Sequence, residues 1–472
     1  MNEQIPNEQL AEVFGERKEA ELDPKLEEVA RNVIDCYDFD PEQESFLVVT
    51  DTKVMAENPD FLIAVERELE ARTSLSPRAK GNYEVLVVPA SPYSATPFEE
   101  YVGDKMKNRP VLIATSMSRS HSRETAAASQ GRIAPKENFD AILESPEAPA
   151  NMANLAEDPD YYTKLQALAQ KTRSRIISMT KGHNPYEILT SGAVEESVES
   201  LRERADNVSE LMQTVKEVRV TTDKGTDITI KVRVDKSDVE DGRLTEPGKI
   251  SNYPIGEWSC SIQLEGTNGT LVADIAAGGN HNKDQFDEHG PIALKVESGV
   301  VTAISGVDLN PLKKLLSEET DYKLLASKDS HDRGLSKKQT AERQRIQKLV
   351  DHYFDEHGLD NPLLRSMLKY WIAGDNPEHH CFRLAEFAVG TNTKACQGKS
   401  AEDIGSSEGE KIYGTTHIAV GSNGTFGVKP DDPNFNDCAI HCDMVISEPT
   451  IECARRDDSK FKLIEHGQPI DY

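Results

Sequence analysis

Five side chains in the C-terminal half of the chain are of types that bind divalent metal ions. Each lies in a short segment that is otherwise rich in apolar residues or glycine. Neutral imidazole and carboxylate are ligands that suit zinc, manganese or cobalt. The five residues are Glu257, Glu386, His417, His441 and Asp443.

The tripeptide His441-Cys442-Asp443 is the simplest of these patterns. In an extended strand, residues two apart project from the same face, so the imidazole and the carboxylate point the same way. A surface strand ending in His and Asp would show the same pattern. On its own, this motif is a weak indication of metal binding.

The other three residues interrupt apolar or glycine-bounded stretches. His417 lies within GTTHIAVG, Glu386 within LAEFAVGTN and Glu257 within NYPIGEW. An imidazole buried without a partner is costly, and a buried Glu is rare unless it is paired or bound to metal. A hydrogen-bonded core histidine would explain His417 alone. Two such Glu, two His and an Asp in one half of the chain together predict a metal site.

These four segments resemble, in order, the signature blocks of the thermophilic metallo-aminopeptidases of the aminopeptidase T type. GTDITIKV, NGTLVADIA and ESGVVTAISG also resemble that family, and the likeness runs from about residue 45 to 466. The resemblance implies two divalent ions (Zn, Co or Mn) held by the five residues above, with Glu257 and Glu386 as the catalytic carboxylates. It further implies a homodimer that removes the N-terminal residue of a peptide substrate with a metal-activated water.

At one position the chain departs from this family. Family peptidases place a tyrosine ligand seven residues after the GTxH histidine, where this chain has Gly424. The alternative is a single-metal or non-catalytic member of the fold. Such a member could resemble the 2,5-dihydroxypyridine dioxygenases, which hold one non-haem iron. Ser422 or Thr425 would then supply a hydroxyl ligand in place of the tyrosine.

Two domains are expected to position these residues. Residues 1–205 alternate short apolar strands with helices, which predicts an α/β domain with an open parallel sheet. Residues 206–472 are rich in short strands punctuated by glycine, which predicts an α+β, β-rich catalytic metal-binding domain. VKEVRVTTDKGTDITIKVRVD, near its start, has the alternation and Lys-Gly turn of a β-hairpin. Residues 326–380 are predicted to be a helical insertion.

Composition excludes several other classes of protein. The formal net charge of −28 disfavours a nucleic-acid partner. No apolar run approaches the ~18 residues of a membrane-spanning helix, so no membrane partner is expected. The polar, acidic N-terminal segment lacks the apolar core of a signal peptide, which favours a cytoplasmic location. The seven scattered cysteines are therefore expected to be reduced thiols.

Overall fold

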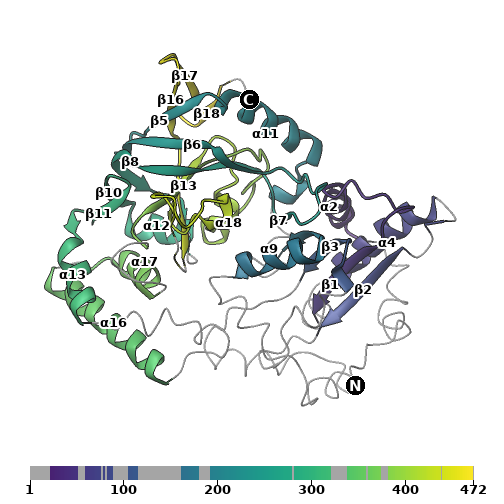
Figure 1. Ribbon diagram of the computed structural model, residues 1–472, viewed down its shortest axis with the longest axis horizontal. Helices are drawn as coiled ribbons and strands as arrows, with labels where there is room; N and C mark the ends of the chain where they lie inside the picture. The colour runs from purple at the N-terminus through teal and green to yellow at the C-terminus, as the bar shows by residue number, and fades with distance from the viewer. Residues whose placement is uncertain are drawn as a thin grey trace. The chain divides into compact units, whose positions relative to one another are not determined.

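The computed structural model describes residues 22–51, 59–75, 78–79, 82–88, 105–114, 161–179, 192–278, 281–319, 337–357, 360–373, 381–436, 438 and 440–470. These residues form two compact units (Figure 1). The first unit contains the described residues up to Glu199 together with Gly242–Ile255, and the second contains Ser200–Asp241 and the residues from Gly256 onward. The chain therefore passes between the units three times.

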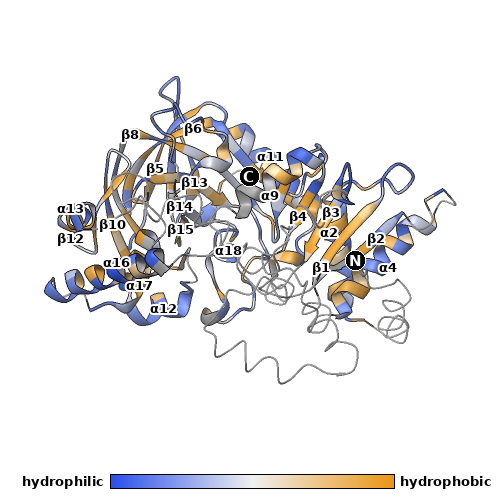
Figure 2. Ribbon diagram, turned by 60° about the horizontal axis from the view of Figure 1, so that its bottom comes forward, coloured by the Kyte–Doolittle hydropathy of each residue, from blue (hydrophilic) through white to orange (hydrophobic). Residues whose placement is uncertain are grey.

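The first unit is built on a parallel sheet in the order β2-β1-β3-β4-β7. Its strands are short apolar runs, and those of β3 and β4 are buried along their whole length. β1 and β3 are accordingly coloured as hydrophobic in Figure 2. The strands are β1 (Phe46–Asp51), β2 (Tyr83–Val88), β3 (Pro110–Ala114), β4 (Arg175–Ser178) and β7 (Ile250–Asn252).

Helices accompany this sheet. In α2, Asp23 caps the first turn by accepting a hydrogen bond from the Lys25 amide. Pro24 is the first helical residue, and an N–H at this position would have no partner within the helix. α2 packs against α4 through its apolar side. The helices are α2 (Pro24–Asp35), α4 (Pro59–Ser74), α9 (Tyr161–Thr172) and the 3₁₀ turn η1 (Gly192–Glu195). The predicted open parallel α/β sheet is confirmed.

The second unit is built on a 13-stranded antiparallel sheet. Its main path runs β18-β17-β16-β5-β6-β8-β13-β14-β15-β9, and β10, β11 and β12 extend it from β8. β5 and β6 form the hairpin predicted from alternation. The strands are β5 (Val215–Thr221), β6 (Asp227–Glu240), β8 (Glu257–Ala273), β9 (Ala276–Ala277), β10 (Ile292–Glu297), β11 (Val300–Ile304), β12 (Val307–Asp308), β13 (Leu384–Gly390), β14 (Thr416–Gly421), β15 (His441–Ile446), β16 (Thr450–Arg455), β17 (Lys460–Glu465) and β18 (Gln468–Pro469).

One face of this sheet forms the core of the unit together with several helices. Trp258, Phe387 and Ile418 from the strands join a cluster that includes Phe354 of α16 and Trp371 of α17. The described part of the segment 326–380 therefore buries an apolar side in the core, although α16 is largely hydrophilic in Figure 2. The helices are α11 (Val198–Met212), α12 (Lys283–His289), α13 (Asn310–Glu319), α16 (Lys337–Glu356), α17 (Pro362–Ala373), α18 (Ser406–Gly409) and the 3₁₀ turns η2 (Ala401–Asp403) and η3 (Gly424–Phe426). Among the described helices, none has the length and apolar character needed to cross a bilayer.

Candidate metal centre

Four neighbouring strands, β8, β13, β14 and β15, carry all five of the predicted ligands. In this part of the sheet Glu386 is opposite Ser261 and Ala419, and Ala419 is opposite Asp443. Directly paired residues point to the same face of a sheet, and residues two apart on one strand do as well. Glu257, Glu386, His417, His441 and Asp443 therefore share one face.

The opposite face carries the apolar core. Along each strand the residues that alternate with the acidic and imidazole groups are buried hydrophobic ones, such as Trp258, Phe387, Ile418 and Met444. On the face of the ligands, Ala419 is the neighbour between Glu386 and Asp443, and its small side chain leaves room for theirs. The period-two pattern of these strands thus separates the polar cluster from the core.

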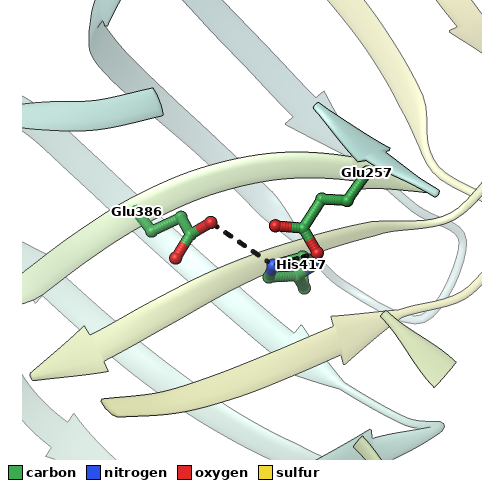
Figure 3. A group of neighbouring side chains, drawn as sticks. All are labelled: Glu257, Glu386 and His417. Carbon is green, nitrogen blue, oxygen red and sulfur yellow. Dashed lines mark ion pairs between the residues drawn. The ribbon is translucent and has the colours of Figure 1, made fainter. Parts of the chain in front are cut away.

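Glu257, Glu386 and His417 converge at the centre of this face (Figure 3). Nε2 of His417 lies 3.7 Å from Oε1 of Glu386, 3.8 Å from Oε2 of Glu257 and 3.9 Å from Oδ1 of Asp443. These separations exceed ordinary hydrogen bonds. The other ring nitrogen, Nδ1, has no hydrogen-bond partner among the described residues. His417 therefore does not resemble a hydrogen-bonded core histidine.

His441 is held in a different way. Its Nδ1 lies 2.8 Å from the Ser422 carbonyl, and only a protonated Nδ1 can donate to that oxygen. Nε2 then faces Oε2 of Glu386 at 2.8 Å and Oδ1 of Asp443 at 3.0 Å. A backbone carbonyl that fixes one ring nitrogen while the other faces carboxylates is the usual support of a metal-binding histidine. The imidazole side chain is 30% exposed, so this side of the cluster is open to solvent.

Two further residues, Glu410 and Lys411, belong to the cluster, and the sequence analysis did not identify them. Glu410 forms a third possible ligand group with His417 and Asp443. The Lys411 ammonium contacts Glu410 and Glu257, and its side chain is only 2% exposed. They follow α18 in the polar stretch SSEGEK, which has the composition of a surface loop. A buried lysine cannot be distinguished from an exposed one by such a pattern.

The pKa values of two carboxyl groups in the cluster are shifted in opposite directions. Burial raises the pKa of Glu257 to about 8, although Lys411 and His417 partly offset this effect. Burial would also raise the pKa of Glu386, but the His417 and His441 imidazoles outweigh it and hold that pKa well below the ordinary value. At neutral pH and without metal, Glu257 therefore carries a proton much of the time, whereas Glu386 is ionised.

The imidazoles respond to the same carboxylates. Burial would lower the pKa of His417, but Glu257, Glu386 and Asp443 raise it to about 9. In His441 the effect of burial is overcome by Asp443 and Glu386, so that its pKa also lies well above the ordinary value. Both imidazoles would bind a proton in the absence of metal. A divalent cation would replace these protons, because a ligating imidazole is neutral.

The remaining candidate ligands are Cys442, Ser422 and Thr425. Burial raises the pKa of the Cys442 thiol to about 12, so it is not a thiolate at neutral pH. The Ser422 hydroxyl accepts a hydrogen bond from the Gly424 amide at 3.3 Å, and Thr425 is exposed. A hydroxyl ligand from either residue stays a prediction. The described cysteines are all free thiols.

The cluster fits a divalent metal ion. Two atoms bound to one ion at ~2.1 Å lie about 3.0–4.2 Å apart, depending on the angle between their bonds. The three His417 separations fall in this range. The donors are imidazole nitrogens and carboxylate oxygens, a set that suits zinc, manganese and iron. All five predicted side chains are thus brought together, with Glu410 as a sixth possible ligand.

Comparison with known proteins gives a fold and a partial family match. No protein of curated function matches the sequence significantly. A family model described as NicX, 2,5-dihydroxypyridine 5,6-dioxygenase, matches residues 114–328, which include Glu257 but not the other four predicted ligands.

Two solved structures are similar to the chain. One is 2,5-dihydroxypyridine dioxygenase from Pseudomonas putida KT2440, with 15% identity over 95% of this chain and 97% of that chain and a TM-score of 0.53. The other is wild-type AmpT from Thermus thermophilus, with 13% identity over 95% of this chain and 99% of that chain and a TM-score of 0.49. At such low identity, the likeness to the dioxygenase shows a shared fold.

Proposed function

We propose that the second unit is a non-haem metal enzyme that binds one divalent iron and uses dioxygen to open a dihydroxylated aromatic ring. The observation that carries this proposal is the pairing of two imidazoles with carboxylates in one cluster. Two histidines and one carboxylate with open positions are the ligand set of non-haem iron oxygenases. Nε2 of His417 and Nε2 of His441 each face Oδ1 of Asp443, at 3.9 and 3.0 Å, and the three residues would supply such a set. The match to the dioxygenase family model supports the same activity.

The residues of the chain have separable roles in this proposal. When bound, iron would supply redox chemistry and a positive charge that draws a substrate hydroxyl toward it. His417, His441 and Asp443 would hold the ion, with Glu386 as a further ionised ligand. Glu257, whose pKa without metal is raised to about 8, would give up its proton when the cation binds and could then accept one from the substrate hydroxyl. The substrate would approach from the side of His441, because the other described side chains of the cluster are at most 8% exposed.

A second candidate function is the aminopeptidase expected from the sequence blocks. The observation that favours it is the overlap of three ligand groups, since Glu386, His417 and Asp443 each belong to two of the three. Overlapping groups of this kind can hold two ions ~3.5–4 Å apart that share one activated water. We rank this function second, because the family model that matches part of the chain is that of a dioxygenase.

One experiment separates the two functions. The protein would be stripped with a chelator, reconstituted without oxygen using Fe²⁺, Zn²⁺, Co²⁺ or Mn²⁺, and freed of excess metal. We expect about one iron per chain and oxygen uptake with 2,5-dihydroxypyridine or a related dihydroxylated ring. About two ions per chain and cleavage of a leucyl chromogenic substrate, without oxygen uptake, would establish the peptidase instead.

Matched variants locate the activity in the cluster. Asp443→Asn removes one carboxylate charge from it, and Asp457→Asn makes the same change in the turn between β16 and β17. We expect the first variant to lose metal and oxygen uptake and the second to retain both. Full activity in Asp443→Asn would exclude the cluster as the active site.

A further inference from the structure

Among the described residues, Lys411 is the only lysine whose ammonium contacts the carboxyl groups of the cluster. Its ammonium lies 2.5 Å from Oε2 of Glu240, 2.6 Å from Oε2 of Glu257 and 3.1 Å from Oε1 of Glu410. An ammonium group has three donors and no acceptor, so three carboxylates satisfy it completely. A buried charge is stable only when it is paired in this way.

The backbone around Lys411 fixes this position. The amide of Asn392 donates to the Lys411 carbonyl at 2.9 Å, so the end of β13 is joined to the segment that carries the lysine. A Cβ atom on Gly390 would lie 2.2 Å from the Ile412 carbonyl oxygen, so only glycine permits the close approach of these two segments. From the other side, Glu240 is opposite Glu257 in the pairing of β6 with β8. Lys411 is therefore anchored at its main chain and at its ammonium.

Two of the three partners of Lys411 are also possible metal ligands. Glu257 belongs to the group with Glu386 and His417, and Glu410 to the group with His417 and Asp443. Glu240 adds a third carboxylate from a neighbouring strand. Three converging carboxylates are a ligand set for a hard divalent cation such as Mn²⁺. In this chain a covalently attached ammonium already occupies the position between them and offsets one of their negative charges.

We infer that Lys411 is a built-in cation, which takes the place of a divalent ion among Glu240, Glu257 and Glu410. Exchangeable metal is thereby confined to Glu386, His417, His441 and Asp443, the residues that would hold the ion in the proposed function. Lys411 is a positioning residue, because it acts through Glu257 and Glu410 and is too deeply buried to reach substrate. This inference deepens the proposed single-metal function and rests on it.

The test is a count of Mn²⁺ per chain in the full-length protein. The chelator-stripped protein would be equilibrated with Mn²⁺, passed through a desalting column and analysed by mass spectrometry of the metal. Lys411→Ala should bind about one ion more than the wild-type chain, because three carboxylates lose their ammonium. Lys411→Arg keeps the charge and should bind the same number as the wild type.

Lys399→Ala is the matched control. Lys399 lies 2.6 Å from Oε2 of Glu408 and is 13% exposed, so its removal also breaks a largely buried ion pair. Glu408 belongs to none of the ligand groups found among the described residues. The control should therefore lose stability without gaining an ion. A gain in Lys399→Ala equal to that in Lys411→Ala would refute the specific role of Lys411.

The expected gain of one Mn²⁺ in Lys411→Ala does not depend on how many ions the wild-type chain binds. A wild-type chain with about two ions contradicts the proposed function, whereas an unchanged count in folded Lys411→Ala overturns the role of Lys411. If Lys411→Ala is unfolded without metal, added Mn²⁺ should restore its folding, as judged by circular dichroism. Failure of Mn²⁺ to restore it would overturn the inference, because the metal could not then replace the ammonium.

Discussion

Raising the pH should destabilise the metal-free second unit through His417. Neighbouring carboxylates raise the pKa of His417 to about 9 in the folded chain, against an ordinary value of 6.5. The folded state therefore binds a proton more tightly than the unfolded state. The resulting stabilisation is fully present below pH ~6.5 and is lost as the pH rises through about 9. Divalent metal should abolish this loss, because it replaces the proton on the ring.

The size of the effect follows from the pKa difference. One pKa unit corresponds to about 1.4 kcal/mol, so His417 contributes at most about 3 kcal/mol between pH 6 and pH 9.5. Urea unfolding followed by tryptophan fluorescence measures it directly. Trp258 and Trp371 are the two tryptophans of the chain, and both belong to the second unit. The signal therefore reports the unit that carries the cluster.

His417→Gln tests the contribution of this residue together with its interaction with Glu257, whose pKa of about 8 lies in the same pH range. Without the imidazole, the free energy of unfolding should fall less between pH 6 and pH 9.5 than in the wild type, by up to about 3 kcal/mol. Cys442 does not confuse the measurement, because burial raises its pKa to about 12. Equal pH dependence of the two metal-free proteins would refute the electrostatic account of the cluster.

Three further outcomes are expected. His441→Ala should weaken metal binding at least ~100-fold in a chelator competition. Ser422→Ala should change it less than about threefold, because His441 is held by the Ser422 backbone carbonyl, which the variant keeps. A tenfold loss in Ser422→Ala would instead show a hydroxyl ligand. Gly390→Ala should lower the free energy of unfolding, measured in urea, by ~3 kcal/mol or more, because its Cβ would lie 2.2 Å from the Ile412 carbonyl oxygen. Gly424→Ala should lower it by less than about 0.5 kcal/mol, because its Cβ would meet only the Ser422 hydroxyl, at 3.6 Å. Raising KCl from ~0.1 to ~2 M should raise the urea midpoint, because salt screens the repulsion within a chain of net charge −28; an unchanged or lower midpoint would contradict this.

Much of the cluster could be predicted from the sequence because strands have a simple period. Glu386 and His417 interrupt apolar strands, and a charged group at such a position has to meet a partner on the same face. His441 and Asp443 are two residues apart, so their common face follows from strand geometry alone. The same reasoning predicted the parallel sheet of the first unit and the β5–β6 hairpin of the second.

Glu410 and Lys411 could not be found in this way. They lie in a short polar turn with no periodicity, and the residues around them are those of an exposed loop. Their burial depends on a contact between the turn and Gly390, about twenty residues earlier in the chain. The number of metal ions could not be predicted either, because under the inference about Lys411 it depends on the contacts of one lysine with three carboxyl groups from separate elements.

Because Gly242–Ile255 belongs to the first unit, the two units cannot be separated at one point of the chain. The segment leaves just after Glu240 and returns just before Glu257, and the Gly256 amide donates to the Glu240 carbonyl at 2.7 Å, which fastens the two ends together. Both of these glutamates bind the Lys411 ammonium. In the chain, β7 of the first unit is thus flanked on both sides by a glutamate of the second unit. No single cut of the chain would therefore yield either unit intact, because the first unit includes residues from both sides of Ser200–Asp241.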